Sequence, residues 1–381
     1  MLHPEFRALR KELQARYRQP DATRQLLELV AHVAMMLAGG ALYFAYTGGD
    51  AGGSWEPWDS WLLRIGGVLL SALGCLGIST SSHTASHDAL LRSRRGNRIV
   101  VQLGFPFLLM VSSTYWYHKH LVVHHPAPNV IGIDEDVNLG PLFAFSHDDC
   151  QREGQRGGWL RRWLLRWQGL VFPVALAFNA FNVQRQGIAF LARKLWSRRR
   201  KARHWRDLGL MVLHIAVFYA APMACFGATE VLGFHLLRSA LLGYLIFGAL
   251  GAAHFPAEAA AVDASQLRGD HVLLQTATTV NFRTGPFGRL LCAGVDYQIE
   301  HHLFPGLGHT HYRRMAPQVE AFCRTHGYPY RVMSWRAAVW KSLRAMATPR
   351  PVVRELGDLR LELRHELRPE LRPDGEPPTK P

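Results

Sequence analysis

The chain has 381 residues, a formal net charge of +15 at pH 7 and 48% hydrophobic residues. Its 5 cysteines form no Cys-x-x-Cys pair, which argues against a thiolate zinc site and against a disulfide framework. The charge alone could indicate nucleic-acid binding. The basic residues are concentrated beside long apolar segments, however, so we expect them to contact anionic lipid headgroups and no nucleic acid.

Four apolar segments reach or approach the ~20 residues that an α-helix needs to cross a bilayer. They are Leu27 to Tyr46, Trp61 to Thr80, Leu208 to Gly227 and Phe234 to Ala253. These segments form two hairpins whose short connectors contain acidic residues but no Lys or Arg. By the positive-inside rule the connectors lie outside, so both termini lie in the cytoplasm. Arg64 and Arg238 lie near the outer ends of two crossings, where we expect their long side chains to snorkel outward.

The pattern predicts an all-α, polytopic membrane protein with three parts. Residues 1–25 form a cytoplasmic N-terminal segment, residues 26–346 a membrane domain with a helical cytoplasmic cap, and residues 347–381 a charged, Pro-rich tail that we expect to be disordered. Two shorter apolar stretches, Ile99 to Val111 and Leu170 to Phe181, each contain a proline and are interpreted as interfacial or re-entrant helices. If they instead cross as a pair, the loop between them lies outside.

The informative histidines among the 20 in the chain lie close to the inner ends of the crossings. His83 and His87 follow the second crossing at an i, i+4 spacing, which places both imidazoles on one helical face. In the next cluster, an α-helix would put His120 and His124 on one face and turn His125 by about 100°, toward a second metal. His118 faces another direction and is left out of the ligand set.

Three further histidines complete the pattern. His301 and His302 form an adjacent pair after the last crossing, and His254 lies at the inner end of that crossing. Because both hairpins enter and leave from the same side, all of these imidazoles would meet at one cytoplasmic surface. A single His-x-x-x-His is more often a solvent-facing or core pair than a ligand pair. Three clusters on one membrane face predict a metal centre, because packed imidazoles without a metal would leave costly unsatisfied polar groups.

The three clusters resemble the histidine boxes of the membrane fatty-acid desaturase family. They stand as His83/His87, His120/His124/His125 and Gln298/His301/His302. The similarity extends to the segments from Asn129 to Asp136 and from Gln298 to Pro305, and it covers approximately residues 25 to 335. Gln298 in place of a first histidine is similar to the acyl-lipid and front-end branch of that family. No His-Pro-Gly-Gly haem signature occurs, so we expect electrons to come from a separate carrier, ferredoxin-like or cytochrome-like.

The resemblance implies a pair of iron ions that activate O2 and introduce a cis double bond into an acyl lipid or acyl thioester. The expected ligands are His83, His87, His120, His124, His125, His254, His301 and His302. The family also implies a ligand after the last crossing, which favours His254 over His271; His309 and His311 are interpreted as structural or substrate-facing. The groups expected to orient the ligand rings are Asp88, Asp296, Gln298 and Glu300.

Two other functions remain open at this point. A lipid or carotenoid hydroxylase or ketolase would use the same metal centre, and the sequence does not separate it from a desaturase. A membrane metal transporter or sensor belongs to a different class, but transport sites lie near the midplane, inside the crossings. His32, His214 and His235 are the histidines inside the proposed crossings, and they form no spacing motif.

Overall fold

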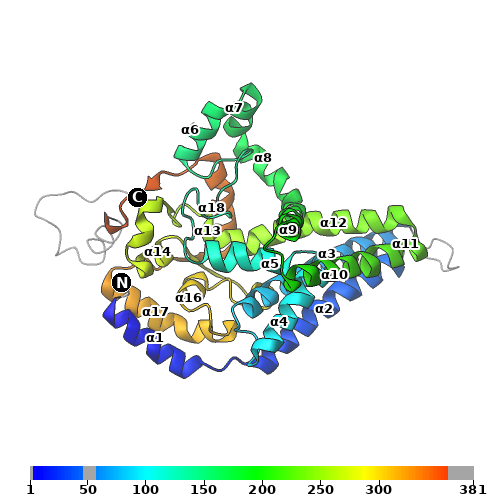
Figure 1. Ribbon diagram of the computed structural model, residues 1–381, viewed down its shortest axis with the longest axis horizontal. Coiled ribbons are helices and arrows are strands. Elements are labelled where there is room, and N and C mark those ends of the chain that lie inside the picture. The colour runs from blue at the N-terminus through cyan, green and yellow to red at the C-terminus, as the bar shows by residue number, and fades with distance from the viewer. Residues whose placement is uncertain (1–2, 46–56, 359–381) are drawn as a thin grey trace, which may run out of the picture.

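Helices dominate residues 3–45 and 57–358, which a computed structural model describes (Figure 1). The expected all-α, polytopic architecture is confirmed by four helical segments that are long and apolar enough to cross a membrane. These segments cover Ala22–Ala45, Trp61–Ser86, Ala202–Phe226 and Ala228–His254. The predicted outer connector from residue 47 to 56 and the end of the predicted tail, residues 359–381, lie outside the described residues.

The membrane bundle consists of α2, α3, the α10–α11 unit and the α12–α13 unit, and its helices α2, α3, α10, α11 and α12 extend to one side in Figure 1. Their bounds are α2 (Ala22–Ala45), α3 (Pro57–Ser86), α10 (Ala202–Ile215), η4 (Ala216–Ala220), α11 (Ala221–Phe226), α12 (Ala228–Ile246), η5 (Phe247–Gly251) and α13 (Ala252–His254). α3 ends at Ser86 rather than at the predicted Thr80, so the first histidine of the chain's first cluster lies inside the helix. The bundle therefore delivers side chains directly to the region beneath the membrane.

Glycines allow α2 and α3 to pack in close contact. A Cβ on Gly39 would lie 2.4 Å from the backbone nitrogen of Ser71, and a Cβ on Gly74 would lie 2.3 Å from that of Met36. Neither distance leaves room for a side chain. Small residues at such contacts let membrane helices approach closely, which strengthens their van der Waals packing.

Two arginines of the crossings are directed into the bundle. Arg64 of α3 forms an ion pair with Glu230 of α12 and donates to the hydroxyl of Tyr43 at 2.7 Å, so it joins the two hairpins. Arg238 of α12 is only 6% exposed and lies over the ring of Phe234. A carboxylate and aromatic faces stabilise the two guanidinium groups, and Arg64 reaches Glu230 in the connector that the sequence places outside, so the expected snorkelling stays a prediction.

Two bent helix pairs lie between the hairpins and contain the shorter apolar stretches. The first comprises α4 (Arg94–Gln102), η1 (Leu103–Leu108), α5 (Ser113–Trp116) and η2 (Tyr117–His124), with a bend of 117°. The second comprises α7 (Trp159–Arg166), α8 (Gln168–Ala175), η3 (Leu176–Phe178) and α9 (Asn179–Trp196), with a bend of 84°. Buried Asp207 of α10 accepts hydrogen bonds from Ser112, Ser113 and Thr114, and these contacts fix the turn of the first pair. If each bent pair crossed the membrane, the chain would have six spans instead of four.

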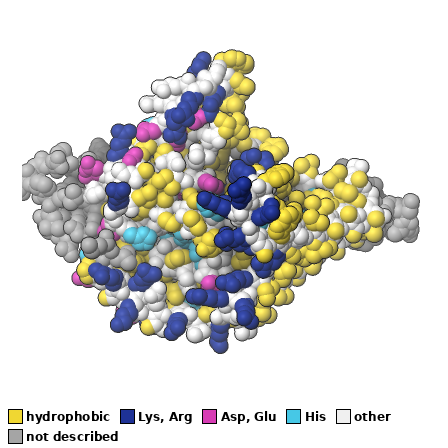
Figure 2. Space-filling model, viewed as in Figure 1, with side chains coloured by type: hydrophobic (Ala, Val, Ile, Leu, Met, Phe, Trp, Pro, Cys, Tyr) yellow, Lys and Arg dark blue, Asp and Glu magenta, His cyan; other side chains and the backbone are white. Residues whose placement is uncertain are grey.

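Basic and apolar side chains occupy different parts of the surface. In Figure 2 hydrophobic side chains cover the membrane bundle, while Lys and Arg gather where the bundle meets the cap. Exposed basic residues before α10 and in its first turns include Arg198, Arg199, Arg200, Lys201, Arg203 and Arg206. This placement agrees with contacts to anionic headgroups at the membrane boundary.

The described part of the cap is built from helices of 3 to 15 residues around a main hydrophobic core, with four short strands. Its helices are α1 (Pro4–Tyr17), α6 (His147–Arg156), η6 (Ala264–Arg268), α14 (His271–Ala277), α15 (Pro286–Cys292), α16 (Gln298–Leu303), η7 (His309–His311), α17 (Tyr312–His326) and α18 (Trp335–Ala347). The strands form two parallel pairs, β1 (Ala261–Val262) with β4 (Val352–Val353) and β2 (Asn281–Arg283) with β3 (Val332–Ser334). Residues of α1, α14, α16 and α17 share the main core, so the N-terminal helix is part of the cap.

The packed cap continues beyond residue 347, where the sequence predicts the start of a disordered tail. Arg350 is 6% exposed, and its guanidinium donates to the backbone carbonyls of Phe255, Pro256 and Ala259. The same group lies 4.2 Å from the centroid of the Phe145 ring. Arg350 therefore anchors the strand β4 on the inner end of the fourth crossing.

Replacing Arg350 with alanine is expected to destabilise the cap by roughly 2–5 kcal/mol, because three buried carbonyls lose their donor. The measurement is the midpoint of thermal aggregation of detergent-purified protein. Arg354→Ala is the matched control, since its side chain is 72% exposed and pairs only at the surface with Asp148. Equal midpoints for the two variants would contradict the anchoring role.

Candidate metal centre

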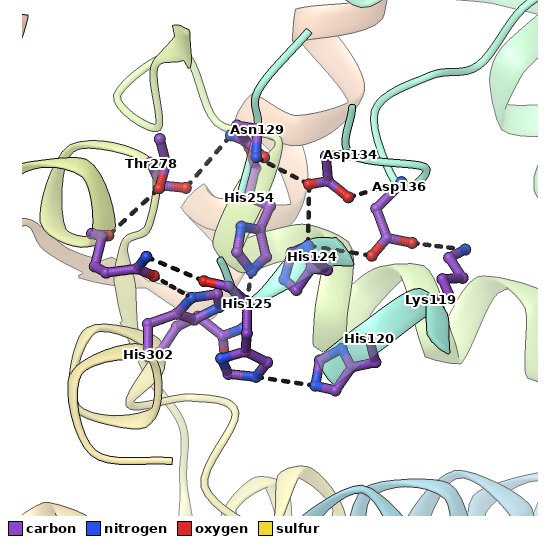
Figure 3. A network of polar contacts seen from close by, with 12 residues as sticks. Lys119, His120, His124, His125, Asn129, Asp134, Asp136, His254, Thr278 and His302 are labelled. Atoms are coloured by element: carbon purple, nitrogen blue, oxygen red, sulfur yellow. Dashed lines mark hydrogen bonds and ion pairs between the residues drawn. The ribbon is translucent and has the colours of Figure 1, made fainter. Parts of the chain in front are cut away.

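The predicted ligand histidines gather in two neighbouring groups at the end of the membrane bundle where α3 and α13 finish. The five-histidine group contains His83, His87, His120, His125 and His301, and the three-histidine group contains His124, His254 and His302. Within each group the candidate ligand atoms all lie within 4.8 Å of one another. The rings of His125 and His302 stack at 4.6 Å, so the two groups adjoin (Figure 3). The fold thus brings all eight predicted histidines together.

Helix ends explain how each side chain reaches the centre. His83 lies in the last turn of α3 and His87 follows one turn later, so both rings point into the same group. On α16, adjacent His301 and His302 diverge by about 100°, and each joins a different group. His254 ends α13 directly after the π-helical turn η5.

The second cluster differs from the sequence-based interpretation, because η2 is a π-helix. Its wider turn places residues i and i+5 on one face, and the His125 N–H donates to the His120 carbonyl at 3.0 Å. His120 and His125 therefore share the five-histidine group, and His124 is turned to the other group. An α-helical spacing had paired His120 with His124 instead.

The distances in the five-histidine group fit a shared metal ion. The Nε2 atoms of His83 and His120 are 2.8 Å apart, and the His125 Nε2 lies 3.1 Å from those of both His120 and His301. Neighbouring nitrogen ligands around an ion with bonds of about 2.1 Å have similar separations. The buried Nε2 atoms of His87 and His302 have no hydrogen-bond partner among the described residues. Such orphaned nitrogens are the atoms that a metal would satisfy.

Burial keeps the imidazoles in the form that binds metals. It lowers the pKa of His87 to about 3, with a smaller contribution from the charge of His124. Burial, followed by neighbouring imidazoles, also holds the pKa values of His125, His301 and His302 well below their usual range. Neutral rings have a free nitrogen lone pair, so these four imidazoles can bind a cation at neutral pH. His124 differs, because the carboxylates of Asp134 and Asp136 outweigh its burial and raise its pKa.

Asp134 orients His124, a role that the sequence did not predict for it. The His124 Nδ1–H donates to the fully buried Asp134 carboxylate at 3.0 Å, and the backbone N–H of Asn129 donates to the same oxygen at 2.9 Å. The Asn129 side chain in turn donates to the carbonyl of His254 at 2.8 Å (Figure 3). This network links both sides of the three-histidine group. The segment Asn129 to Asp136 carried the only sequence signal, as part of the family resemblance.

Three further contacts fix ligand rings. His302 Nδ1 lies 2.8 Å from Oε1 of buried Gln275, and His301 Nδ1 lies 3.3 Å from the hydroxyl of Tyr312. Gln298 Nε2 lies 2.8 Å from Nε2 of His254, so this predicted orienting residue does contact a ligand histidine. The acceptors on Nδ1 of His301 and His302 leave Nε2 of these two rings directed to the centre. In His254 the contact is on Nε2, and Nδ1 is the ring nitrogen without a hydrogen-bond partner among the described residues.

The three carboxylates expected to orient rings are directed elsewhere. Asp88 is exposed and lies 3.7 Å from Arg94. Asp296 accepts from the hydroxyl of Thr284, and burial raises its pKa to about 6. Glu300 accepts from Asn281 and Tyr330, and burial raises its pKa to about 7. These carboxylates were predicted to orient the rings because they are close to the histidines in sequence. Neighbouring residues of a helix point to different faces, however, so closeness in sequence does not bring their side chains together.

The remaining histidines do not join these groups. His118 is exposed and its ring stacks on Phe190, His309 pairs with Glu28, and His271 begins α14. His311 lies 2.9 Å from the Gln19 carbonyl.

The histidines inside the crossings each contact a backbone carbonyl, and they do so at separate places. His32 lies 3.1 Å from the carbonyl of Leu290, His214 lies 2.6 Å from that of Phe107, and His235 lies 2.7 Å from that of Phe218. Among the described residues, these three form no common cluster that could serve as a transport site.

An apolar cavity adjoins the five-histidine group on the membrane side. It is lined by Ser79, Phe105, Leu109, Val111, Trp116, Ala180, Val183, Gln184, Leu242, Ile246 and Leu250. Trp116 connects the two features, since its ring stacks on His120 with centroids 4.7 Å apart. The indole therefore forms a wall between the cavity and the histidines.

Comparison with known proteins agrees with this arrangement. The chain is 29% identical over 265 residues to the Delta(5) fatty acid desaturase fat-4 of Caenorhabditis elegans, which covers 68% of this chain and 57% of that protein. It is 25% identical over 269 residues to fatty acid desaturase 3 of Bos taurus, with 69% and 56% covered. It is 25% identical over 306 residues to the sn-1 linoleoyl-lipid 6-desaturase of Synechocystis sp., with 74% and 79% covered.

The chain thus spans little more than half the length of the first two of these relatives. The family model described as fatty acid desaturase matches residues 59–334, which contain all eight histidines of the centre. The chain therefore belongs to the fatty acid desaturase family.

Proposed function

We propose that this protein is an O2-dependent fatty-acyl lipid desaturase that introduces a cis double bond with a histidine-ligated pair of iron ions. The observation that carries the proposal is the convergence of the five-histidine and three-histidine groups beside an apolar cavity. Two of the relatives are named as desaturases of a fatty acid and of a linoleoyl lipid, which supports this substrate class.

The two groups suit two ions. One ion would be held by His83, His87, His120, His125 and His301, and the other by His124, His254 and His302. Imidazole is a suitable ligand for iron, and a donor set without carboxylates leaves the ions cationic. Iron with O2 would supply the oxidant that unactivated methylene groups require, which no side-chain acid or base provides.

The reaction takes two hydrogens from the acyl chain and two electrons and two protons from outside, and it reduces O2 to two molecules of water. We infer that a separate ferredoxin-like or cytochrome-like carrier delivers the electrons. The protein itself holds the acyl chain of the substrate and keeps bulk water away from the metal centre. Asp134, Gln275 and Tyr312 fix the ligand rings while this happens.

The apolar cavity is the proposed site for the part of the acyl chain that reacts. Its wall of Phe105, Leu109 and Leu242 offers a hydrocarbon surface, and Trp116 lies between that surface and His120. A methylene group held against the indole would lie next to the five-histidine group. The basic surface before α10 would hold the anionic headgroup or thioester carrier of the substrate.

We further propose that the centre and both termini lie in the cytoplasm. The proposal rests on the basic residues that follow α9 and precede α10, at the same end of the bundle as the histidines. The short connectors at the other end lack Lys and Arg.

The test is mass spectrometry of acyl lipids from a host that lacks the reaction and expresses the wild type or His301→Ala. We expect the wild type to yield acyl chains with two hydrogens fewer, and His301→Ala to yield none while remaining in the membrane. His118→Ala is the control and should keep the product, because His118 is exposed and outside both groups. Hydroxylated chains in place of alkenes, or changed metal uptake with unchanged lipids, would overturn the proposal.

A further inference from the structure

A separate cluster of metal-binding side chains lies at the surface of the cap, where α1 meets the end of α17. His3 directly precedes α1, Glu5 lies in its first turn, and His326 is the last residue of α17. We call these three residues the surface triad. Their ligand atoms lie within 4.8 Å of one another, and α1 lies alongside α17 in Figure 1. We propose that the surface triad binds a zinc ion, which clips α1 to the cap.

The donor set of the surface triad matches zinc chemistry. Two imidazoles and one carboxylate leave one position of a tetrahedral ion for water, a combination that Zn²⁺ accepts at bond lengths of about 2.0–2.2 Å. The His326 Nε2 lies 2.5 Å from a Glu5 carboxylate oxygen, and the centroids of the His3 and His326 rings are 5.0 Å apart. The Glu5 side chain is 64% exposed, so it can rotate slightly to admit the ion.

Aromatic neighbours hold the two imidazoles in place. The His3 ring contacts Phe322 and Tyr328 edge-on, and the His326 ring lies 4.6 Å from Phe322. The Nδ1 atom of His3 is buried and has no hydrogen-bond partner among the described residues. A buried polar atom without a partner is costly, and an ion in the triad would compensate for that cost.

The C-terminal end of α17 adds an electrostatic field that favours a cation in the surface triad. Its last carbonyl groups carry the negative end of the helix dipole, which favours a cation beside His326. The charge of Glu5 acts in the same direction. The surface triad therefore combines geometry, donor chemistry and electrostatics that suit one divalent cation.

A zinc ion in the surface triad would stabilise the part of the cap that packs behind the metal centre. Phe6 of α1 packs against Phe304 at 5.7 Å, and Phe304 lies two residues after His302. Fixing the N-terminal end of α1 thus fixes the layer behind the last histidine pair. This role needs no iron chemistry, so it stands or falls separately from the desaturase proposal.

The test is a titration of the full chain, purified without a polyhistidine tag, with zinc chloride. Bound zinc and the midpoint of thermal aggregation are measured for the wild type, His326→Ala and Glu5→Gln. We expect the wild type to bind one more zinc ion per chain than His326→Ala and to gain several degrees in its midpoint. Glu5→Gln keeps a hydrogen-bond acceptor for His326 but should bind zinc at least about tenfold more weakly.

His311→Ala is the matched control. His311 lies just before α17 and contacts the ring of Tyr17 and the carbonyl of Gln19, so it also joins the N-terminal region to α17. It lies outside the surface triad. It should keep the wild-type zinc content. All variants keep the eight histidines of the metal centre, so the difference in zinc reports only the surface triad. Equal zinc in the wild type, His326→Ala and Glu5→Gln, or a wild-type midpoint that zinc does not raise, would overturn the proposal. If His326→Ala fails to fold, the exposed Glu5→Gln change still decides the outcome.

Discussion

Alanine in place of His125 is expected to reduce acyl desaturation roughly 100-fold or more and to remove bound iron. His125 lies where the two groups meet: its Nε2 lies 3.1 Å from the Nε2 atoms of His120 and His301, and its ring stacks on His302. Its loss therefore disturbs both groups at once. The measurements are iron per chain by elemental analysis and product by mass spectrometry.

The control for this change is His118→Ala in the same segment. His118 is exposed and packs on Phe190 rather than on another histidine, so its removal should leave the iron content and product near wild-type values. A His125→Ala protein that retained full iron and full turnover would show that the five-histidine group does not hold an ion as proposed.

Asparagine in place of Asp134 is expected to lower activity about 10- to 100-fold, with a smaller loss of iron. One carboxylate oxygen accepts from His124 and from the Asn129 backbone, and the other accepts from the backbone of Asp136. An amide must turn its NH2 group toward one of these donors. His124 would then lose its fixed orientation, or the Asn129 turn that supports His254 would open.

Glu135→Gln makes the same chemical change at the neighbouring position and serves as the control. Glu135 is exposed, whereas Asp134 is fully buried, so we expect near wild-type activity from the glutamine variant. The two variants should be compared by product yield and by iron content at equal protein. If the two variants had the same product yield and the same iron content, the proposed role of Asp134 in orienting His124 would be wrong.

The membrane architecture was predictable because hydrophobicity over about 20 residues is a strong and local signal. The second crossing begins at Trp61 as expected, and the fourth ends at His254, one residue after the predicted Ala253. The contacts of the Arg64 side chain could not be predicted in the same way. Its partners Tyr43 and Glu230 come from other helices, and their proximity follows only from the packing of the two hairpins.

The three histidine clusters could be predicted from their spacing, and His254 was added from its position and the family resemblance, but the division of the histidines between two groups could not be predicted. Spacing arguments assume 3.6 residues per turn, whereas η2 is a π-helix and pairs His120 with His125. The orienting residues were missed for a different reason. Gln275 and Tyr312 lie 27 and 11 residues from the rings they contact, so no local pattern connects them to His302 and His301.

The origin of the ligands has a consequence for biogenesis. Each histidine group combines residues from before the third crossing with residues of α16 in the cap, so neither group is complete until translation has passed His302. By then all four crossings have been synthesised. If the two groups hold iron as proposed, metal loading would follow the synthesis of all four crossings, and an iron-starved cell would accumulate full-length apoprotein.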